Sequence, residues 1–217
     1  MRPFTLNTTR IPLIAIVLLV SGCSLLRDTW SGPQQRLSGL LEHRGDAFVL
    51  TQCGSDHAQP VNASNSLNEV FAQAAQPGQR VIFVDMLGQV DRSERITSGE
   101  VLRMQSQGRG CSDHSGDGAQ WIALQYKPAW RAALAANGLT RSDAERGYPA
   151  QPVVTEQSAD GSLNARSLQG DELELWLYPQ ACQDLVTGDY FHMSATLLVD
   201  GERFTGCAYQ GRQTAPR

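Results

Sequence analysis

The sequence predicts a mainly β fold with minor α content, built as small antiparallel barrel or sandwich units and stapled by two disulfides. Three observations lead to this class. Short apolar or alternating runs, five to eight in all, are separated by turns rich in Gly and Asn. Helical patterns are few and short, and four cysteines are left for pairing.

Four of the runs have residue types and lengths typical of strands: residues 47–53, 80–85, 121–124 and 172–178. Residues 80–85 are almost continuously apolar, which indicates a buried strand. In residues 172–178 every second residue is a leucine. Leu173, Leu175 and Leu177 are therefore expected on one face of their strand.

The clearest local pattern is a hairpin near the end of the sequence. Residues 193–199 and 202–208 flank Asp200-Gly201, a dipeptide typical of two-residue hairpin turns. If the residues next to the turn pair with each other, Cys207 lies opposite Ser194.

Helix is expected in residues 66–75, where Ser66 and Glu69 have the spacing of a capping box. Apolar residues recur on one face of this helix, namely Leu67, Val70, Phe71 and Ala74. Residues 129–136 are rich in alanine and predict a second helix by propensity alone. Residues 105–120 and 140–170 show little apolar periodicity, so long loops are expected there, with a short strand near residues 153–154.

Four of the five cysteines are candidates for disulfides, because an even number in an oxidising compartment favours pairing. Three connectivities are open, and we favour Cys53–Cys111 and Cys182–Cys207, which staple the two halves of the chain separately. Cys182 precedes the predicted hairpin and would reach Cys207 from a neighbouring strand. A metal site is the alternative, but no C-x-x-C or H-x-x-x-H spacing occurs.

The remaining cysteine, Cys23, follows a segment that reads as an export signal. Two arginines precede residues 11–20, an apolar stretch of ten residues that is too short to span a membrane. Residues 20–23 (Val-Ser-Gly-Cys) resemble the bacterial lipobox, in which small residues precede a cysteine that receives a diacylglyceryl group. The alternatives are an ordinary secretory signal cut elsewhere or a buried apolar helix.

These features predict four parts of the chain: a lipoprotein signal peptide (1–22), a lipidated tether (23–36), an N-terminal β-rich half with one short helix (37–110) and a C-terminal β-rich half (111–212). Ser24 stands where Asp would retain a lipoprotein at the inner membrane. Ser24 therefore predicts the periplasmic face of the outer membrane; the outer leaflet of the inner membrane is the alternative. The tether reaches at most ~40 Å, which keeps the protein near one membrane surface.

The charge balance gives no electrostatic basis for binding nucleic acid. The whole chain has a formal net charge of −4, and removal of residues 1–22 takes away two arginines and no acidic residue. The mature chain is therefore more acidic still, whereas nucleic-acid binding needs a basic surface.

The second half of the chain resembles a family of uncharacterised bacterial envelope proteins and lipoproteins. The family pattern is Trp-x-Ala-x-Gly-Asn-Glu-Pro-x-Trp, then Cys-x-Asp-x-Met-Ser-Gly, then Gly-Cys. The corresponding segments here are residues 121–130, residues 182–188 and Gly206-Cys207. The resemblance covers roughly residues 111–212, and residues 45–54 resemble the half that precedes this domain in some family members.

The chain departs from the family pattern at its polar positions. Gln125-Tyr126-Lys127 replaces Gly-Asn-Glu, and Val186-Thr187 replaces Met-Ser. Any activity that depends on the glutamate is therefore not implied. The resemblance also implies a strand from Trp130 onward, and since tertiary context often overrides propensity, we favour a strand or short irregular segment over the alanine-rich helix.

No catalytic motif stands out, so no catalytic residue, cofactor or metal is expected. His192 has the position of an ordinary strand residue, and residues 111–117 have the Ser, Asp and Gly content of a solvated turn, although the same residue types occur in metal loops. Trp121, Trp130 and Trp176 are expected as core aromatics, with a ligand-lining role as the alternative.

The favoured function is a lipid-anchored, periplasm-facing and non-enzymatic binding or structural module. Its expected partners are the membrane, through lipid on Cys23, and an envelope protein or cell-wall component. The alternative is a carrier that holds a small apolar ligand inside a hollow barrel. A third hypothesis is a lysozyme inhibitor, because residues 187–190 resemble the Ser-Gly-x-Lys-Tyr loop of such proteins, although an aspartate replaces the cation.

Substitution of Cys23 tests the anchor. Cells that produce the Cys23→Ala variant should incorporate no labelled palmitate into the protein, because the only thiol at the lipobox is gone. Labelling of the wild-type chain is the positive control, and a variant that remains labelled would show that the lipid is attached elsewhere.

Overall fold

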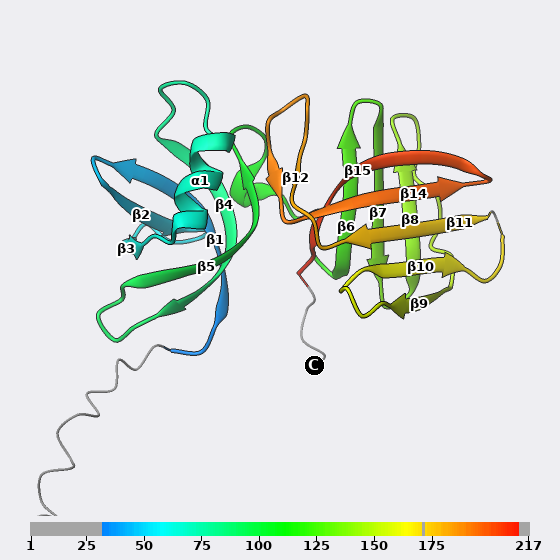
Figure 1. The fold of residues 1–217 in the computed structure, drawn as a ribbon, viewed down its shortest axis with the longest axis horizontal. Helices are drawn as coiled ribbons and strands as arrows, with labels where there is room; N and C mark the ends of the chain where they lie inside the picture. Colours follow the sequence, from blue (N-terminus) through cyan, green and yellow to red (C-terminus); the bar gives the residue numbers. More distant parts are fainter. Residues whose placement is uncertain (1–31, 171, 213–217) are drawn as a thin grey trace, which may run out of the picture. The chain divides into compact units, whose positions relative to one another are not determined.

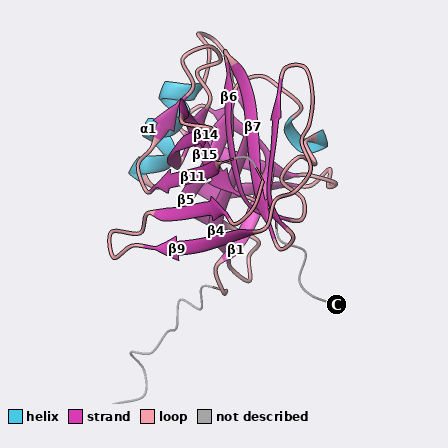
Figure 2. Cartoon of the chain, turned by 90° about the vertical axis from the view of Figure 1, so that its right-hand side faces the viewer, coloured by secondary structure: helices cyan, strands magenta, loops and turns pink. Residues whose placement is uncertain are grey.

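The computed structural model describes residues 32–170 and 172–212, which form fifteen strands, one α-helix and one 3₁₀ turn in two sheets (Figures 1 and 2). The predicted mainly β fold with two disulfides is confirmed. The expected number of strands, five to eight, was too small. The predicted signal peptide and Cys23 lie outside the described residues.

The first sheet contains seven strands and carries the helix and the 3₁₀ turn beside it. Its elements are β1 (Gln35–Arg44), β2 (Ala47–Gln52), β3 (Ala58–Asn62), α1 (Asn65–Ala74), β4 (Val81–Val90), β5 (Ile96–Gln105), η1 (Gly110–Ser112), β12 (Cys182–Gln183) and β13 (Tyr190–Phe191).

Five strands of this sheet close into a ring in the order β1–β2–β3–β5–β4–β1. All the pairings are antiparallel except β3–β5, which is parallel and joins two residue pairs, Val61 with Ile96 and Asn62 with Thr97. The helix lies between the third and fourth strands in the sequence. This connectivity is that of the OB-fold, a small five-stranded barrel that is partly open.

The helix α1 contributes its apolar face to the core of this ring. Leu67, Val70, Phe71 and Ala74 are buried, as the sequence pattern predicted. The predicted N-cap was wrong: Ser64 caps the helix, and its Oγ accepts a hydrogen bond from the Leu67 amide at 3.2 Å. Ser66 lies inside the first turn, so the predicted capping box does not form.

The second sheet has eight strands that pair in a simple meander. They are β6 (Ala119–Tyr126), β7 (Ala129–Ala135), β8 (Gly138–Asp143), β9 (Val153–Gln157), β10 (Leu163–Ser167), β11 (Leu173–Tyr178), β14 (Met193–Val199) and β15 (Glu202–Gln210). The first and last strands in the sequence are neighbours, because β15 pairs with β6. The remaining gap is bridged between Leu139 on β8 and Gln151, which precedes β9, by two backbone hydrogen bonds of 2.9 Å.

The expectations for this second half had mixed outcomes. The alanine-rich segment forms strand β7 and no helix, as favoured from the family resemblance. Residues 140–170 were expected as a long loop with a short strand near residues 153–154; β9 confirms that strand, whereas the end of β8 and all of β10 were not predicted. Most residues of β9 are exposed, so β9 lacks the alternating pattern of a half-buried strand.

The predicted hairpin and its register are confirmed. Strands β14 and β15 pair with Val199 opposite Glu202 and Ser194 opposite Cys207. On β11, Leu173, Leu175 and Leu177 share the buried face, as the alternation predicted.

Leucine and alanine side chains from this sheet fill its interior. The buried cluster comprises Ala123, Trp130, Ala132, Leu134, Leu139, Leu163, Ala165, Leu173, Leu175, Leu177, Met193, Ala195, Leu197 and Ala208. A cavity of about 230 Å³ lies where Trp130, Leu197 and Phe204 meet Arg141 and other polar residues. This volume is below the range of about 300–1,000 Å³ that is usual for ligand pockets.

A short hairpin from the second half completes the first sheet. Strand β13 pairs with β5 at Met104 and Arg103, on the edge of β5 that β3 leaves free. The following residue, His192, donates its backbone N–H to the Leu102 carbonyl oxygen at 3.0 Å. The two halves of the chain therefore share one sheet, which the sequence did not predict.

Both predicted disulfides form. Cys53 at the end of β2 pairs with Cys111 in η1, with the two Cα atoms 5.3 Å apart. Cys182 on β12 pairs with Cys207 on β15, with the Cα atoms 5.4 Å apart. Because β12 belongs to the first sheet and β15 to the second, the second disulfide also links the two sheets. Within residues 32–170 and 172–212, no helix has the length and apolar character needed to cross a bilayer.

Gly138 tests the closure of the second sheet. Its φ of +119° is unfavourable for other residues, and a Cβ there would overlap the carbonyl oxygen of Gln151. Gly138→Ala should lower the free energy of unfolding by about 2 kcal/mol, measured by urea denaturation. Gly147→Ala is the matched control, because a Cβ at Gly147 meets nothing within 4 Å, and it should change stability by less than about 0.5 kcal/mol. Equal unfolding midpoints for the two variants would contradict this account of the closure.

Candidate binding site

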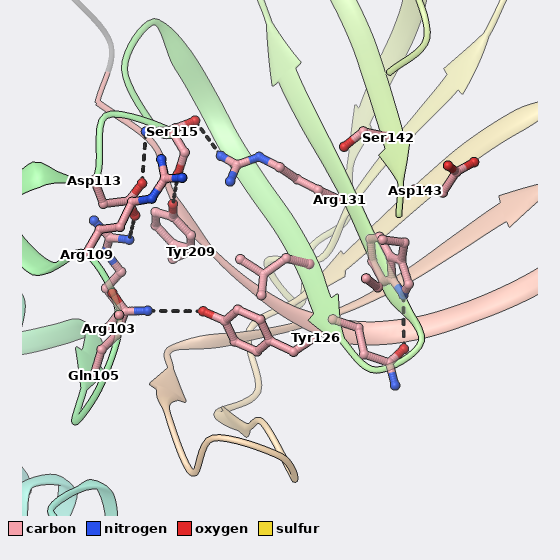
Figure 3. Close-up of a pocket in the computed structure, with 15 residues that line it drawn as sticks. Arg103, Gln105, Arg109, Asp113, Ser115, Tyr126, Arg131, Ser142, Asp143 and Tyr209 are labelled. Atoms are coloured by element: carbon pink, nitrogen blue, oxygen red, sulfur yellow. Dashed lines mark hydrogen bonds and ion pairs between the residues drawn. The ribbon is translucent and has the colours of Figure 1, made fainter. Parts of the chain in front are cut away.

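A pocket of about 410 Å³ lies beside the last strand of the five-stranded ring and the hairpin of β6 and β7 (Figure 3). Its walls come from β5, the segment after β5, strands β6 to β8, and β15. The lining residues are Arg103, Gln105, Gly108, Arg109, Asp113, Ser115, Leu124, Gln125, Tyr126, Ala129, Trp130, Arg131, Ser142, Asp143 and Tyr209.

One wall is built on a buried chain of alternating charges. Arg103, only 2% exposed, donates from Nη1 to Asp113 Oδ2 at 2.6 Å, and its Nε lies 3.4 Å from Asp85 Oδ2. Asp85 is fully buried and accepts two hydrogen bonds from Arg36, at 2.7 and 2.6 Å, and one from Ser38 at 2.9 Å. An unpaired ion in this place would cost several kcal/mol, so each charge depends on its neighbours.

The Arg103 guanidinium is also enclosed by aromatic rings. Its central carbon lies 5.0 Å from the centre of the Phe83 ring and 4.4 Å from that of Tyr209. A planar guanidinium can stack on a ring and still donate hydrogen bonds in its plane, which the ammonium of a lysine cannot do. The wall of the pocket is therefore held by contacts on both the faces and the edges of Arg103.

The carboxyl group of Asp113 is held in its charged form. Burial alone would raise its pKa, but hydrogen bonds from Ser115 and Arg103 lower the pKa to about 2. Asp85 behaves in the same way, because the arginines on either side of it outweigh its burial and lower its pKa.

A second buried carboxylate lies beneath the pocket. Asp189, 1% exposed, accepts a hydrogen bond from Gln105 Nε2 at 3.1 Å and one from the Ser106 amide at 3.2 Å. Burial raises its pKa above the usual value. The Tyr126 side chain lies over Asp189, and its hydroxyl is 3.2 Å from Gln105 Nε2. Burial, together with the nearby charge of Asp189, raises the pKa of the Tyr126 phenol.

Two further arginines line the pocket without a carboxylate partner among the described residues. Arg131 on β7 donates to the backbone oxygen of Ser115, and its side chain extends toward the segment that carries Asp113 (Figure 3). Arg109 lies in the exposed segment between β5 and η1. The pocket thus combines the aromatic rings of Tyr126 and Tyr209 with the guanidinium N–H groups of Arg109 and Arg131, which are available to an anion.

Of the three tryptophans predicted as core or pocket residues, only Trp130 lines this pocket. Its Nε1 donates to Gln125 Oε1 at 3.0 Å and to the Thr205 carbonyl oxygen at 3.2 Å. Trp121 packs instead against the ring of His192, with ring centres 6.0 Å apart. Trp176 lies on the face of β11 opposite the buried leucines and stacks on Tyr178.

The three segments on which the family resemblance rests lie together in the structure. A Cβ at Gly206 would come within 2.7 Å of Trp130 Cζ2, so glycine at this position makes room for the indole. The neighbouring Cys207 forms the disulfide to Cys182. Asp184, two residues after Cys182, accepts hydrogen bonds from the backbone amides of Val186 and Thr187, both at 2.9 Å. These motif positions therefore have structural roles.

The residues considered from the sequence for catalysis or metal binding make contacts within the fold. His192 Nδ1 lies 2.9 Å from the Leu102 carbonyl oxygen, and burial lowers its pKa. In the segment 111–117, Asp113 is bound by Arg103, and His114 pairs with Asp117 at 3.0 Å. The described part of the chain contains no group of three or more His, Cys, Asp or Glu side chains that could hold a metal ion.

The sequence did not indicate the arginines of the pocket, and Asp113 stood out only as part of the segment 111–117, which has the residue types of a metal loop. Asp85 ends a run of apolar residues and gave the only usable signal, since a charge within a buried strand needs a partner. Strand β5, which carries Arg103 and Gln105, was not predicted at all. Comparison of the whole chain with family models, with curated proteins and with solved structures finds no match.

Asp113 gives a test of the buried charge chain. Its pKa of about 2 in the folded protein is below the ordinary 3.8, so its charged form stabilises the fold above about pH 4, and this stabilisation is lost as the pH falls toward 2. Asp113→Asn should lower the free energy of unfolding by about 2 kcal/mol at pH 7. The difference from wild type should shrink below pH 4 in urea denaturation.

The control variant is Asp46→Asn, which removes the same charge from the exposed turn between β1 and β2. It should leave the unfolding midpoint nearly unchanged at pH 7. A difference between Asp113→Asn and wild type that stays constant from pH 7 to pH 3 would show that the stabilisation does not come from the ionised carboxylate.

Proposed function

We propose that the protein is a lipid-anchored envelope lipoprotein that faces the periplasm and acts as a non-enzymatic binding module. The N-terminal signal and Cys23 support the anchor, and Ser24 supports the outer membrane. The observation that carries the binding role is the pocket beside β5 and the β6–β7 hairpin, because its wall is held in advance by the Arg36–Asp85–Arg103–Asp113 chain.

A binding role agrees better with the pocket than an enzymatic role does. Its described lining residues include two serines but no histidine or cysteine. A serine nucleophile needs an adjacent base, and the Ser115 hydroxyl lies instead 3.5 Å from the hydroxyl of Tyr209. A binding site requires an apolar surface with a few polar groups held in place, and this pocket has both.

The alternative functions have less support. A carrier would hold its ligand inside the second sheet, but leucine and alanine side chains occupy most of that interior and leave a cavity of about 230 Å³, below the usual size of a ligand pocket. Trp176 faces away from this interior. A lysozyme inhibitor would present residues 187–190 to the enzyme, yet the Asp189 side chain is buried and bonded to Gln105. The resemblance to uncharacterised envelope lipoproteins remains a hypothesis that agrees with the proposed location.

A photo-crosslinking amino acid at Ala129 tests the binding role in intact cells. Ala129 is exposed and lines the pocket. The expected result is a light-dependent product between the protein and an envelope component, detected as a mass shift on a gel. Mass spectrometry of tryptic peptides from that product would identify a protein partner, and a loss of mass on muramidase digestion would identify a cell-wall glycan.

The matched control carries the same crosslinker at Glu156, an exposed residue of β9 in the second sheet. It should not give the product seen at Ala129. Identical products from the two positions, or no product from Ala129, would overturn the proposal that this pocket binds an envelope component.

A further inference from the structure

We propose that the pocket binds small monocarboxylates, with the acid group held by Arg109 and Arg131 and an apolar, ring-sized body resting on Tyr126. This inference rests on the proposed binding role and names the chemical class of the ligand. It follows from the charges of the lining residues, from the partners those charges already have, and from the size and surface of the cavity.

Unpaired donors, and not an excess of positive charge, favour an anion in this pocket. Three arginines and two aspartates line it, and the buried carboxylate of Asp189 lies beneath it against Gln105 and Tyr126. A singly charged carboxylate fits this nearly balanced set of charges better than a phosphate dianion does. The charge of the whole chain gives an anion no long-range attraction, so recognition depends on local donors.

Both aspartates of the pocket are already engaged. Asp113 is held by Arg103 and by Ser115. Asp143 accepts hydrogen bonds from the backbone amides of Glu145 and Arg146, at 2.9 and 3.0 Å. A cationic ligand would therefore have to displace internal bonds, whereas an anion meets donors that are unoccupied.

The donors belong to Arg109 and Arg131. A guanidinium has five N–H groups, and in the described part of the chain the side chain of Arg131 forms one hydrogen bond, to the Ser115 carbonyl oxygen. No hydrogen bond or ion pair joins the Arg109 side chain to another described residue. Arginine binds carboxylates in a paired geometry, with two parallel N–H···O bonds.

The body of the ligand would meet an apolar surface. Leu124, Tyr126 and Ala129 line the side of the pocket formed by β6 and β7. Tyr126 is 40% exposed while its hydroxyl is hydrogen-bonded to Gln105, so part of its ring is available to a ligand. A volume of about 410 Å³ accommodates an acylated amino acid or the end of a short peptide.

Titration calorimetry on the full chain in a neutral detergent tests this ligand class. The probe is N-acetyl-tyrosine, and its control is N-acetyl-tyrosinamide, which has the same body but no charge. The acid should bind about tenfold more tightly than the amide, because the amide cannot form the charged hydrogen bonds. Inorganic phosphate, tested separately, should bind more weakly than the acid.

Three variants assign the binding to the proposed arginines. Arg109→Gln and Arg131→Gln should each weaken binding of the acid about tenfold, with little change in affinity for the amide. Arg166→Gln removes the same charge from an exposed position on β10 and should leave the affinity unchanged. Thermal unfolding of Arg109→Gln should match wild type, since Arg109 is exposed, which separates lost binding from lost structure.

The proposal is overturned if the acid and the amide bind equally, if phosphate binds more tightly than the acid, or if no saturable binding of the acid occurs. It is also overturned if Arg166→Gln weakens binding as much as the other two variants. Crosslinking at Ala129 separates this outcome from failure of the proposed function. An envelope product at Ala129 without binding of small acids would leave the module in place and reject the ligand class.

Discussion

The buried carboxylate of Asp85 is the constraint on which the rest of the structure depends. It is fully buried, on the face of β4 opposite the core residues Ile82, Val84 and Met86. A buried charge is tolerated only with partners of opposite sign, and Arg36 from β1 binds this carboxylate while Arg103 from β5 approaches it. Because β1, β4 and β5 each contribute one charge, the three strands must keep one register for the charges to meet. Arg36 also donates to the backbone oxygens of Gln210 and Gly211, so the same group of charges holds the end of β15 against the first sheet.

The hairpin β12–β13 provides the other connection between the two sheets, and it acts by backbone pairing and a covalent bond. Strand β13 completes the edge of β5 that β3 leaves free, and the Cys182–Cys207 disulfide ties the base of the hairpin to β15. The candidate pocket lies beside this junction, and its walls come from both sheets. A binding site between two sheets keeps its shape without a ligand when the sheets cannot move apart. Here backbone pairing, the chain of ion pairs and a disulfide all oppose that movement.

Local sequence patterns predicted those parts of the fold that depend on neighbouring residues. The Asp-Gly turn set the register of β14 and β15, the apolar face of α1 followed from its spacing, and the Cys182–Cys207 pair followed from its position beside the predicted hairpin. The patterns gave no strand at β5 or β10, and at β7 the alanine content alone imitated a helix, so that only the family resemblance indicated a strand. The pocket was largely hidden for a different reason. Its arginines lie on segments with no local signal, and their roles depend on Asp85 and Asp113, which only the folded chain brings close.

The long sequence separation of the contacts around Asp85 has a consequence for folding. Chains are made from the N-terminus, so the five strands of the ring exist before residues 182–191 and before β15. Until those segments arrive, the edge of β5 beside Arg103 lacks its partner strand, and Arg36 lacks the carbonyl groups that it binds across 174 and 175 residues. Contacts of this range slow folding, because a long loop must close before they form. The first ring therefore passes through a stage with an uncovered strand edge, and it reaches its final form only when the last strand of the chain is in place.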